Sequence, residues 1–280
     1  ECMRKHQNAK VRVLQELLTE EELPYELVTG NEVGVLLLDY ICAGRIEKGT
    51  MPEKPVAVKS IVSTPLADAV AEHYGVELRS VLTGFKWIGD QIANLEADGE
   101  VDRFIFGFEE SYGYLAGPYV RDKDAVIGSM LICEMAAYYR RQGKSLVQVI
   151  NELYDRYGYY QNTTLSYSFE GAEGMEIMAG KMSFMREHPF REIAGMKVVK
   201  TADYQLSEAV DLATGQKTEI KLPKSNVLSY SLEGGAAVIV RPSGTEPKIK
   251  VYVTSVGKDL AHASQITKRL GDFMSGVINQ

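Results

Sequence analysis

The sequence has few cysteines, a single tryptophan and no long apolar run. Its 280 residues include three cysteines, Cys2, Cys42 and Cys133, which lie far apart and form no C-x-x-C pair. This arrangement argues against a disulfide framework, and we expect Cys42 and Cys133, which lie in apolar runs, to be buried thiols. We find no signal peptide and no stretch that could span a bilayer, so we expect a cytoplasmic protein with no membrane partner.

Basic residues are outnumbered by acidic ones. The 31 Lys and Arg residues and 38 Asp and Glu residues give a formal net charge of −7 at pH 7. Because the chain has no basic tract to bind a polyanion backbone, we expect no nucleic-acid partner, although a small anionic ligand needs only a few local cations. None of the four histidines has metal-like spacing with another ligand, so we predict no metal-binding residue in this chain.

The order of expected strands and helices predicts two domains. Over residues 56–157, buried strands such as Val101–Phe108 alternate with helices. This alternation predicts an α/β domain, with a mostly parallel sheet and helices on both faces. From about Gly195, short strands are followed by one final helix, Asp259–Val277, which predicts a smaller α+β domain with an antiparallel sheet and helices.

The expected domain boundaries follow from changes in composition. An amphipathic helix is predicted over residues 4–22, within an N-terminal segment of residues 1–29. The α/β domain is predicted over residues 30–170. A hinge or linker follows over residues 171–194, in a region richer in Tyr, Ser, Gly and Met. The α+β domain takes residues 195–280.

A seven-residue string near the C-terminus, Arg241-Pro242-Ser243-Gly244-Thr245-Glu246-Pro247, lies between two predicted strands. A tight Ser-Gly-Thr turn can direct successive backbone N–H groups at one point. Two hydroxyl groups and the Arg241 guanidinium add donors around that point, which is the chemistry of a pocket for a phosphate ester. The same residue types also build ordinary polar hairpin turns, so composition alone leaves both interpretations open.

A second string, Gly107-Phe108-Glu109-Glu110-Ser111-Tyr112-Gly113-Tyr114, follows the strongest predicted strand. Loops at the carboxyl ends of strands form the ligand crevice of an open α/β sheet. There, Glu109 and Ser111 could bond to adjacent hydroxyl groups of a sugar. A solvated acidic turn is the alternative interpretation.

Two cationic segments fit the same pocket. Lys86 follows a glycine turn within Thr83–Gly89, and Arg121 and Lys123 lie in Arg121-Asp122-Lys123-Asp124. Either segment alone would be an ordinary surface charge cluster. Together with the carboxylates they supply what a sugar phosphate needs, namely acceptors for its hydroxyl groups and cations for its phosphate.

These four strings resemble segments of the α-D-phosphohexomutases, the phosphoglucomutase and phosphomannomutase family, over roughly residues 25–280. The 241–247 string is similar to the phosphate-binding loop of the family's last domain, and the 107–114 string to its sugar-recognition loop. Ala125 stands where the family's Arg-Asp-Lys-Asp-Gly segment has glycine. The resemblance implies the family's third and fourth domains, with a remnant of the preceding domain within residues 1–29.

The resemblance also implies roles for these residues. The sugar or its phosphate would be contacted by Lys86, Glu109, Ser111, Arg121 and Lys123. The phosphate distal to the reacting one would be held by Arg241, Ser243, Gly244 and Thr245. The 107–114 string is closer to the phosphoglucomutase branch, but preference for glucose or mannose stays open.

The activity implied by the resemblance is interconversion of hexose 1-phosphate and hexose 6-phosphate through a bisphosphate such as glucose 1,6-bisphosphate. A phosphoserine and Mg²⁺ take part, held by a Ser-His-Asn-Pro-like loop and an Asp-x-Asp-x-Asp-Arg loop that this sequence does not contain. We therefore expect a C-terminal fragment without catalytic residues of its own, which needs the missing N-terminal domains for turnover. A non-catalytic sugar-phosphate binding module is the alternative hypothesis.

Overall fold

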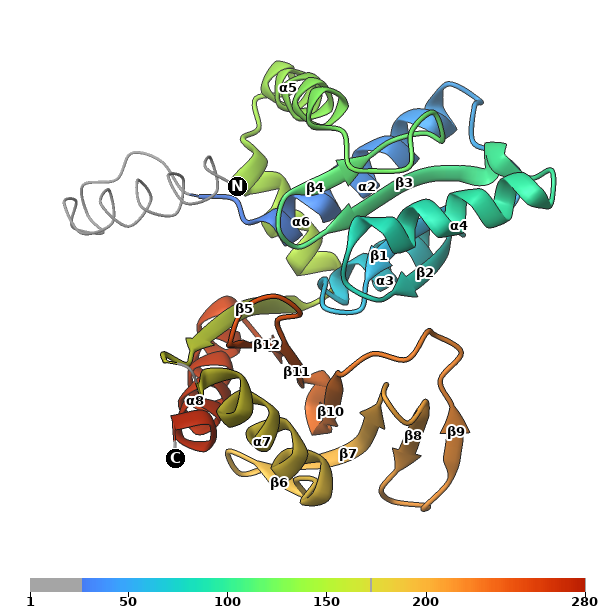
Figure 1. Ribbon diagram of the computed structural model, residues 1–280. Helices are drawn as coiled ribbons and strands as arrows, with labels where there is room; N and C mark the ends of the chain where they lie inside the picture. Colours follow the sequence, from blue (N-terminus) through green and yellow to red (C-terminus); the bar gives the residue numbers. More distant parts are fainter. Residues whose placement is uncertain (1–26, 172, 280) are drawn as a thin grey trace.

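The computed structural model describes residues 27–171 and 173–279, so the predicted helix over residues 4–22 lies outside the described residues. Figure 1 shows two units, an upper one that ends with α6 and a lower one that begins with β5. They correspond in order and type to the α/β and α+β architectures predicted from the sequence.

The first unit is built on a four-stranded sheet with the order β2-β1-β3-β4. Strands β1 (Val56–Ser60), β2 (Glu77–Val81) and β3 (Phe104–Glu109) are parallel, and a 3₁₀ turn (Val101–Arg103) leads into β3. Strand β4 (Gly113–Leu115) returns antiparallel to β3. The sheet is thus mostly parallel, as predicted, with an antiparallel edge strand that the sequence analysis did not include.

Helices cover both faces of this sheet. One face carries four helices, α2 (Gly30–Glu47), α3 (Leu66–His73), α5 (Ala125–Arg141) and α6 (Leu146–Tyr157), and the other carries α4 (Phe85–Ala97). Successive side chains of a strand point to opposite faces. Accordingly, Ala57 packs with α2 and α3, whereas Val56 and Val58 pack with α4. The predicted two-sided helix cover is therefore confirmed.

Helix caps agree with the sequence, but two burial predictions do not. Ser145 caps α6, and its Oγ accepts a hydrogen bond from the backbone N–H of Gln148 at 3.2 Å. The spacing of Leu66, Val70 and His73 predicts that His73 lies on the inner face of α3, but His73 is exposed, because α3 buries Ala67 and Ala71 instead. Cys133, expected to be buried, is also exposed, since α5 contacts the core only along a narrow stripe. Cys42 is buried as predicted.

The second unit is an antiparallel sheet with the order β5-β12-β11-β10-β7-β8-β9, and a further strand, β6, pairs with β7. The strands are β5 (Tyr159–Ser168), β6 (Glu192–Ile193), β7 (Met196–Asp203), β8 (Glu208–Asp211), β9 (Lys217–Glu219), β10 (Leu228–Leu232), β11 (Ala237–Pro242) and β12 (Lys248–Gly257), with a 3₁₀ turn at Glu233–Gly235. Helices α7 (Gly174–Glu187) and α8 (Leu260–Asn279) pack on one face of the sheet. The opposite face of this antiparallel sheet is therefore available for a binding site.

Strand β5 lies in the second sheet, whereas the sequence analysis placed residues up to 170 with the first domain. All its residues from Tyr159 to Ser168 pair with β12. Helix α7, within the expected linker, adds Met178, Met182 and Met185 to the second core. The Tyr- and Ser-rich part of the region with altered composition, before the expected linker, is thus a strand with one polar face. The chain passes between the units at Gly158, which ends α6 with φ of 110°.

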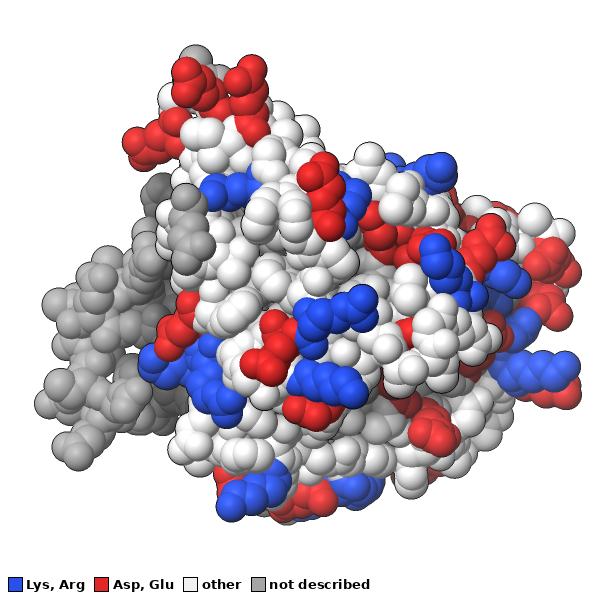
Figure 2. All heavy atoms as spheres, turned by 90° about the horizontal axis from the view of Figure 1, so that it is seen from below, with Lys and Arg blue, Asp and Glu red and all other residues white. Residues whose placement is uncertain are grey.

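The surface carries charges of both signs. On the face shown in Figure 2, Lys and Arg side chains lie among Asp and Glu side chains rather than in a tract of their own. Several surface charges of the molecule form ion pairs, as in Lys268 with Asp272 at 2.7 Å and Lys217 with Glu208 at 3.0 Å. Within residues 27–171 and 173–279, no helix combines the length and the apolar character needed to cross a membrane.

Candidate functional site

The acidic string forms a tight hairpin between β3 and β4. Glu109 pairs with Gly113 across the hairpin, which leaves a three-residue turn whose last residue, Tyr112, has φ of 60°. Such turns place their last residue in the left-handed region. Glu109 is only 6% exposed, and its Oε1 accepts a hydrogen bond from the backbone N–H of Gly84 at 2.7 Å. Ser111 is exposed at the turn.

The first turn of α4 adjoins this hairpin because of the bond between Gly84 and Glu109. Gly84 precedes the helix with φ of 121°, a conformation that favours glycine. Lys86, the second residue of α4, is exposed, and its Nζ lies 4.4 Å from the centroid of the Trp87 ring. Glu109 and the segment that carries Lys86 therefore form one continuous surface.

The two cations of the 121–124 segment lie differently. The Nζ of Lys123 is 5.7 Å from the centroid of the Phe85 ring, and its Cδ would be 3.3 Å from a Cβ on Gly113. Lys123 is thus beside both the hairpin and the start of α4. The guanidinium of Arg121 instead pairs with Glu96, with 2.5 Å between Nη2 and Oε2. The structure therefore brings Lys123 to Glu109 but turns Arg121 toward α4.

Helix α2 fixes the position of the hairpin, and this contact was not predicted from the sequence. The hydroxyl of Tyr114 donates to the carbonyl of Gly30 at 3.0 Å, and that of Tyr112 to the carbonyl of Val28 at 3.3 Å. A Cβ on Gly30 would lie 2.1 Å from the carbonyl oxygen of Glu110. The Thr-x-x-Glu spacing at Thr29 could have indicated where α2 begins, because Thr29 and Glu32 form a capping box at the start of this helix.

The second candidate loop connects β11 to β12. The Oγ of Ser243 accepts hydrogen bonds from the backbone N–H groups of Thr245 at 3.4 Å and Glu246 at 3.3 Å. The two N–H groups therefore converge on one oxygen atom. Gly244 and Thr245 are exposed, and Arg241 is half-buried just before the loop. The arrangement has the convergent donors that an anion pocket needs.

One cation of the second unit, Lys250, is close enough to the acidic hairpin of the first to act on its charge. Arg241 and Lys250 are direct partners across β11 and β12, and such partners share one face of a sheet. Burial and the neighbouring Glu109 raise the pKa of Glu110, while the charge of Lys250 acts in the opposite direction. Glu110 and Tyr252 also line one cavity of about 160 Å³ between the units. The hairpin and the β12 residues Lys250 and Tyr252 thus lie on neighbouring surfaces.

Glu110 gives a pH-dependence prediction. Because its pKa is raised in the folded protein, the folded state binds this proton more tightly than the unfolded chain, and stability falls as pH rises through that window. Glu110→Gln should therefore raise the melting temperature at neutral pH, and the gain should disappear below pH 4.5, the ordinary value of a glutamate carboxyl. Thermal unfolding from pH 4 to 8 tests this, with Glu53→Gln, an exposed position, as control. Equal gains in both variants would contradict it.

Across residues 27–171 and 173–279, no group of three or more His, Cys, Asp or Glu residues could hold a metal ion. The described residues therefore do not fit the Mg²⁺ that the resemblance implies for the family.

Two family models match this architecture. Residues 29–157 match the α/β/α domain III of phosphoglucomutase/phosphomannomutase, and residues 194–267 match the C-terminal domain of the same proteins. A phosphoglucomutase from Staphylococcus aureus strain MRSA252 is 39% identical over 236 residues, which cover 84% of this chain and 41% of that protein. The two family-model matches together include the segments with the candidate residues.

Solved structures share the fold. The phosphoglucomutase pp63/parafusin from Paramecium, in its open form, has a TM-score of 0.61 at 18% identity, covering 90% of this chain and 42% of that one. A putative phosphomannomutase from Thermus thermophilus has a TM-score of 0.57 at 18% identity, covering 90% and 41%. At this identity the likeness concerns the fold alone.

An α/β unit followed by an antiparallel α+β unit defines the two C-terminal domains of the phosphohexomutase architecture. The chain belongs to the phosphoglucomutase/phosphomannomutase family, the family that its motifs indicated, and carries domains III and IV. It spans about two fifths of the length of the curated relatives it matches, as its 41% coverage of the Staphylococcus aureus protein illustrates.

Proposed function

We propose that this chain forms the substrate-binding half of a phosphoglucomutase-like enzyme, an isomerase that interconverts hexose 1-phosphate and hexose 6-phosphate through a bisphosphate. The observation that carries the proposal is the hydrogen bond between Glu109 and Gly84 at 2.7 Å, which unites the acidic hairpin with the lysine-bearing turn of α4. Lys250, the partner of Arg241 across β11 and β12, acts on Glu110 of the same hairpin from the other unit. Acceptors for a sugar and cations for its phosphate are thus supplied together.

In this proposal the hairpin binds the sugar. One oxygen of Glu109 already accepts from Gly84, and the second oxygen, with the hydroxyl of Ser111, bonds to sugar hydroxyl groups. Lys86 and Lys123 lie near enough to this hairpin to contact the sugar or its phosphate. Arg121 joins them only if its ion pair with Glu96 opens, which costs little because both partners reach solvent.

The second unit holds the distal phosphate. The backbone N–H groups of Thr245 and Glu246 converge where the Ser243 hydroxyl now lies, and a phosphate oxygen could occupy a nearby position. Gly244 has no atom within 4 Å of the place where a Cβ would lie, so the loop is open at this residue. Arg241 donates a charge-assisted hydrogen bond to this phosphate.

Turnover would require parts outside the described residues. Phosphoryl transfer depends on a positioned nucleophile and on neutralisation of developing charge, which Mg²⁺ provides in many such enzymes. We assign the phosphoserine and the Mg²⁺ to N-terminal domains of the parent protein, and glucose 1,6-bisphosphate to its intermediate. The isolated chain would then bind hexose phosphates without turnover, and the parent protein would act in the cytoplasm.

Replacing Arg241 by alanine should weaken binding of glucose 1-phosphate by about 1.5–3 kcal/mol, the scale of a hydrogen bond to a charged group. Ser243→Ala should weaken it through loss of the side chain that organises the turn. Calorimetric titration measures both effects. The control is Arg191→Ala, an exposed arginine of the same unit that precedes β6. Unchanged affinity in the Arg241 variant would remove the β11–β12 loop from the site.

A further inference from the structure

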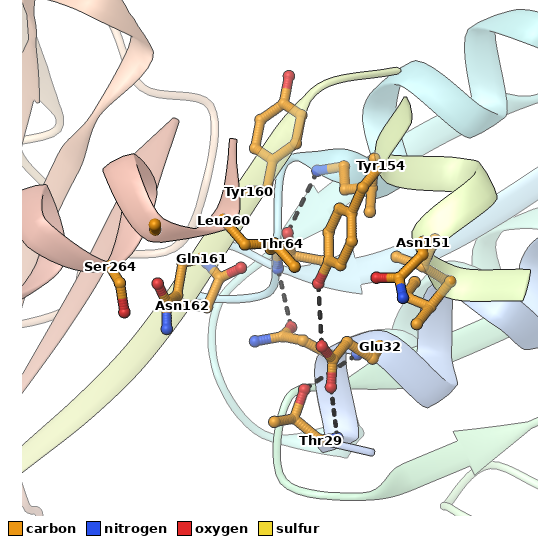
Figure 3. A pocket seen from close by; sticks show the side chains of 15 residues that line it. Thr29, Glu32, Thr64, Asn151, Tyr154, Tyr160, Gln161, Asn162, Leu260 and Ser264 are labelled. Atoms are coloured by element: carbon orange, nitrogen blue, oxygen red, sulfur yellow. Dashed lines mark hydrogen bonds between the residues drawn. The ribbon is translucent and has the colours of Figure 1, made fainter. Parts of the chain in front are cut away.

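A second cavity, of about 370 Å³, lies between the two units (Figure 3). The first unit contributes residues from the starts of α2 and α3 and from α6, and the second contributes the first residues of β5 and the start of α8. None of the residues proposed to bind the phosphosugar lines it. Its volume falls within the range of small-molecule sites, which is roughly 300–1,000 Å³.

The chemistry of the cavity does not suit an anion. Its lining contains no Lys or Arg, and Glu32 is its one charged residue. The helix starts around it already have acceptors. Glu32 Oε2 accepts from the N–H of Thr29 at 2.6 Å, and Asp259 Oδ1 accepts from the N–H of His262 at 2.7 Å. These backbone N–H groups already have acceptors, and Glu32 carries a negative charge. A phosphate in the cavity would therefore not regain the free energy lost on its desolvation.

Neutral polar groups face the cavity from both units. The Oε1 of Gln161 is buried and lacks a hydrogen-bond partner within the described part of the chain, so it is an acceptor in need of a donor. Figure 3 shows Gln161 and Ser264 on the side of the second unit and Asn151 on the opposite side. These side chains combine donors and acceptors without charge.

The walls between these polar groups are aromatic and aliphatic. The rings of Tyr154 and Tyr160 line the cavity together with Val35, Leu66 and Leu260. The hydroxyl of Tyr154 donates to Glu32 Oε1 at 3.0 Å, which helps to hold the side chain in position. A ligand that alternates C–H and O–H surface matches such a lining, since apolar walls and a few convergent polar groups are what small-molecule sites share.

We propose that this cavity, the junction cavity, binds a neutral polyhydroxylated molecule of monosaccharide size. Because its lining comes from both sides of the Gly158 connection, the bound molecule contacts both units at once. A ligand that fits only one relative orientation of the units stabilises that orientation. Occupancy of the junction cavity would thereby restrict the movement of the second unit against the first. This site is separate from the proposed phosphosugar site and does not depend on it.

The test is ligand-observed NMR titration of the full chain with D-glucose as the probe. Ser264 and Gln265 are neighbouring exposed residues of α8, and only Ser264 lines the cavity. Ser264→Trp should fill the cavity and weaken glucose binding by at least about tenfold, equivalent to roughly 1.4 kcal/mol. Gln265→Trp should bind glucose like the unchanged chain, and because both positions are exposed, both variants should fold.

A competition experiment separates the two sites. Glucose 1-phosphate should not displace glucose, and Ser264→Trp should leave glucose 1-phosphate binding unchanged. Three results would each overturn the proposal: no saturable glucose binding at millimolar concentrations, equal binding by the two tryptophan variants, or displacement of glucose by glucose 1-phosphate. The first two results do not bear on whether Arg241 and Glu109 bind a phosphosugar.

Discussion

Gly30→Ala should destabilise the first unit by about 1–3 kcal/mol, the usual cost of forcing an extra carbon into a packed contact. The added Cβ would lie 2.1 Å from the carbonyl oxygen of Glu110 and 2.9 Å from the backbone nitrogen of Tyr112. Both atoms belong to the backbone, so the clash cannot be relieved by rotating a side chain. The hairpin must move, and phosphosugar binding should weaken together with the free energy of unfolding, measured by urea denaturation.

Gly44→Ala is the matched control in the same helix. A Cβ at Gly44 would have no atom within 4 Å, so the change should be neutral or stabilise α2 by up to about 1 kcal/mol, because alanine is the better helix former. The two glycine variants should therefore differ in sign. Equal stabilities would mean that α2 does not hold the hairpin as closely as the structure indicates.

Asp68→Ala should cost about 3 kcal/mol, the lower end of what removing one partner of a buried ion pair costs. Lys59 is 4% exposed, and its Nζ lies 2.5 Å from Asp68 Oδ2. The lower end applies because the Asp68 side chain is 54% exposed. Burial lowers the pKa of Lys59, and Asp68 opposes this effect, so the pKa should fall further in the variant.

The pH dependence follows from the direction of this pKa shift. A lysine whose pKa is lower in the folded state binds more protons in the unfolded chain, so stability rises with pH between the two values. The Asp68→Ala variant should therefore regain part of its lost stability at alkaline pH. Asp90→Ala, an exposed aspartate on α4, is the control. The double variant Lys59→Met with Asp68→Ala should recover most of the loss, and failure to recover would contradict the buried-charge explanation.

Patterns within one segment were sufficient to predict most of the elements. The sequence pattern predicts a helix over about residues 125–141 and a cap at Ser145, and the structure has α5 at Ala125–Arg141 and Ser145 as the N-cap of α6. Strand β4 was missed because it has three residues, including a glycine, and its partner lies in the same motif that indicated a ligand loop. Strand β5 was misplaced because its partner, β12, lies about ninety positions later in the chain. Sequence periodicity carries no information about such a pairing.

The candidate site was predictable as a set of residue types but not as a geometry. The motifs identified Glu109, Ser111 and the 241–247 loop. They did not reveal that Glu109 is held by the N–H of Gly84, nor that Arg121 is turned toward Glu96. Both contacts depend on how α4 packs against the sheet. The junction cavity was likewise invisible in the sequence, because residues from two separate units line it.

The two-unit phosphosugar site is tested most directly by an ¹H–¹⁵N correlation titration of this chain with glucose 1-phosphate, without added metal. Saturable shifts are expected in the backbone amides of Gly84, Glu109 and Ser111 and of the Ser243–Thr245 loop, with little change at the β8–β9 hairpin. Shifts in only one of the two loops, or in neither at saturating ligand, would contradict the claim that the two units together form the phosphosugar site.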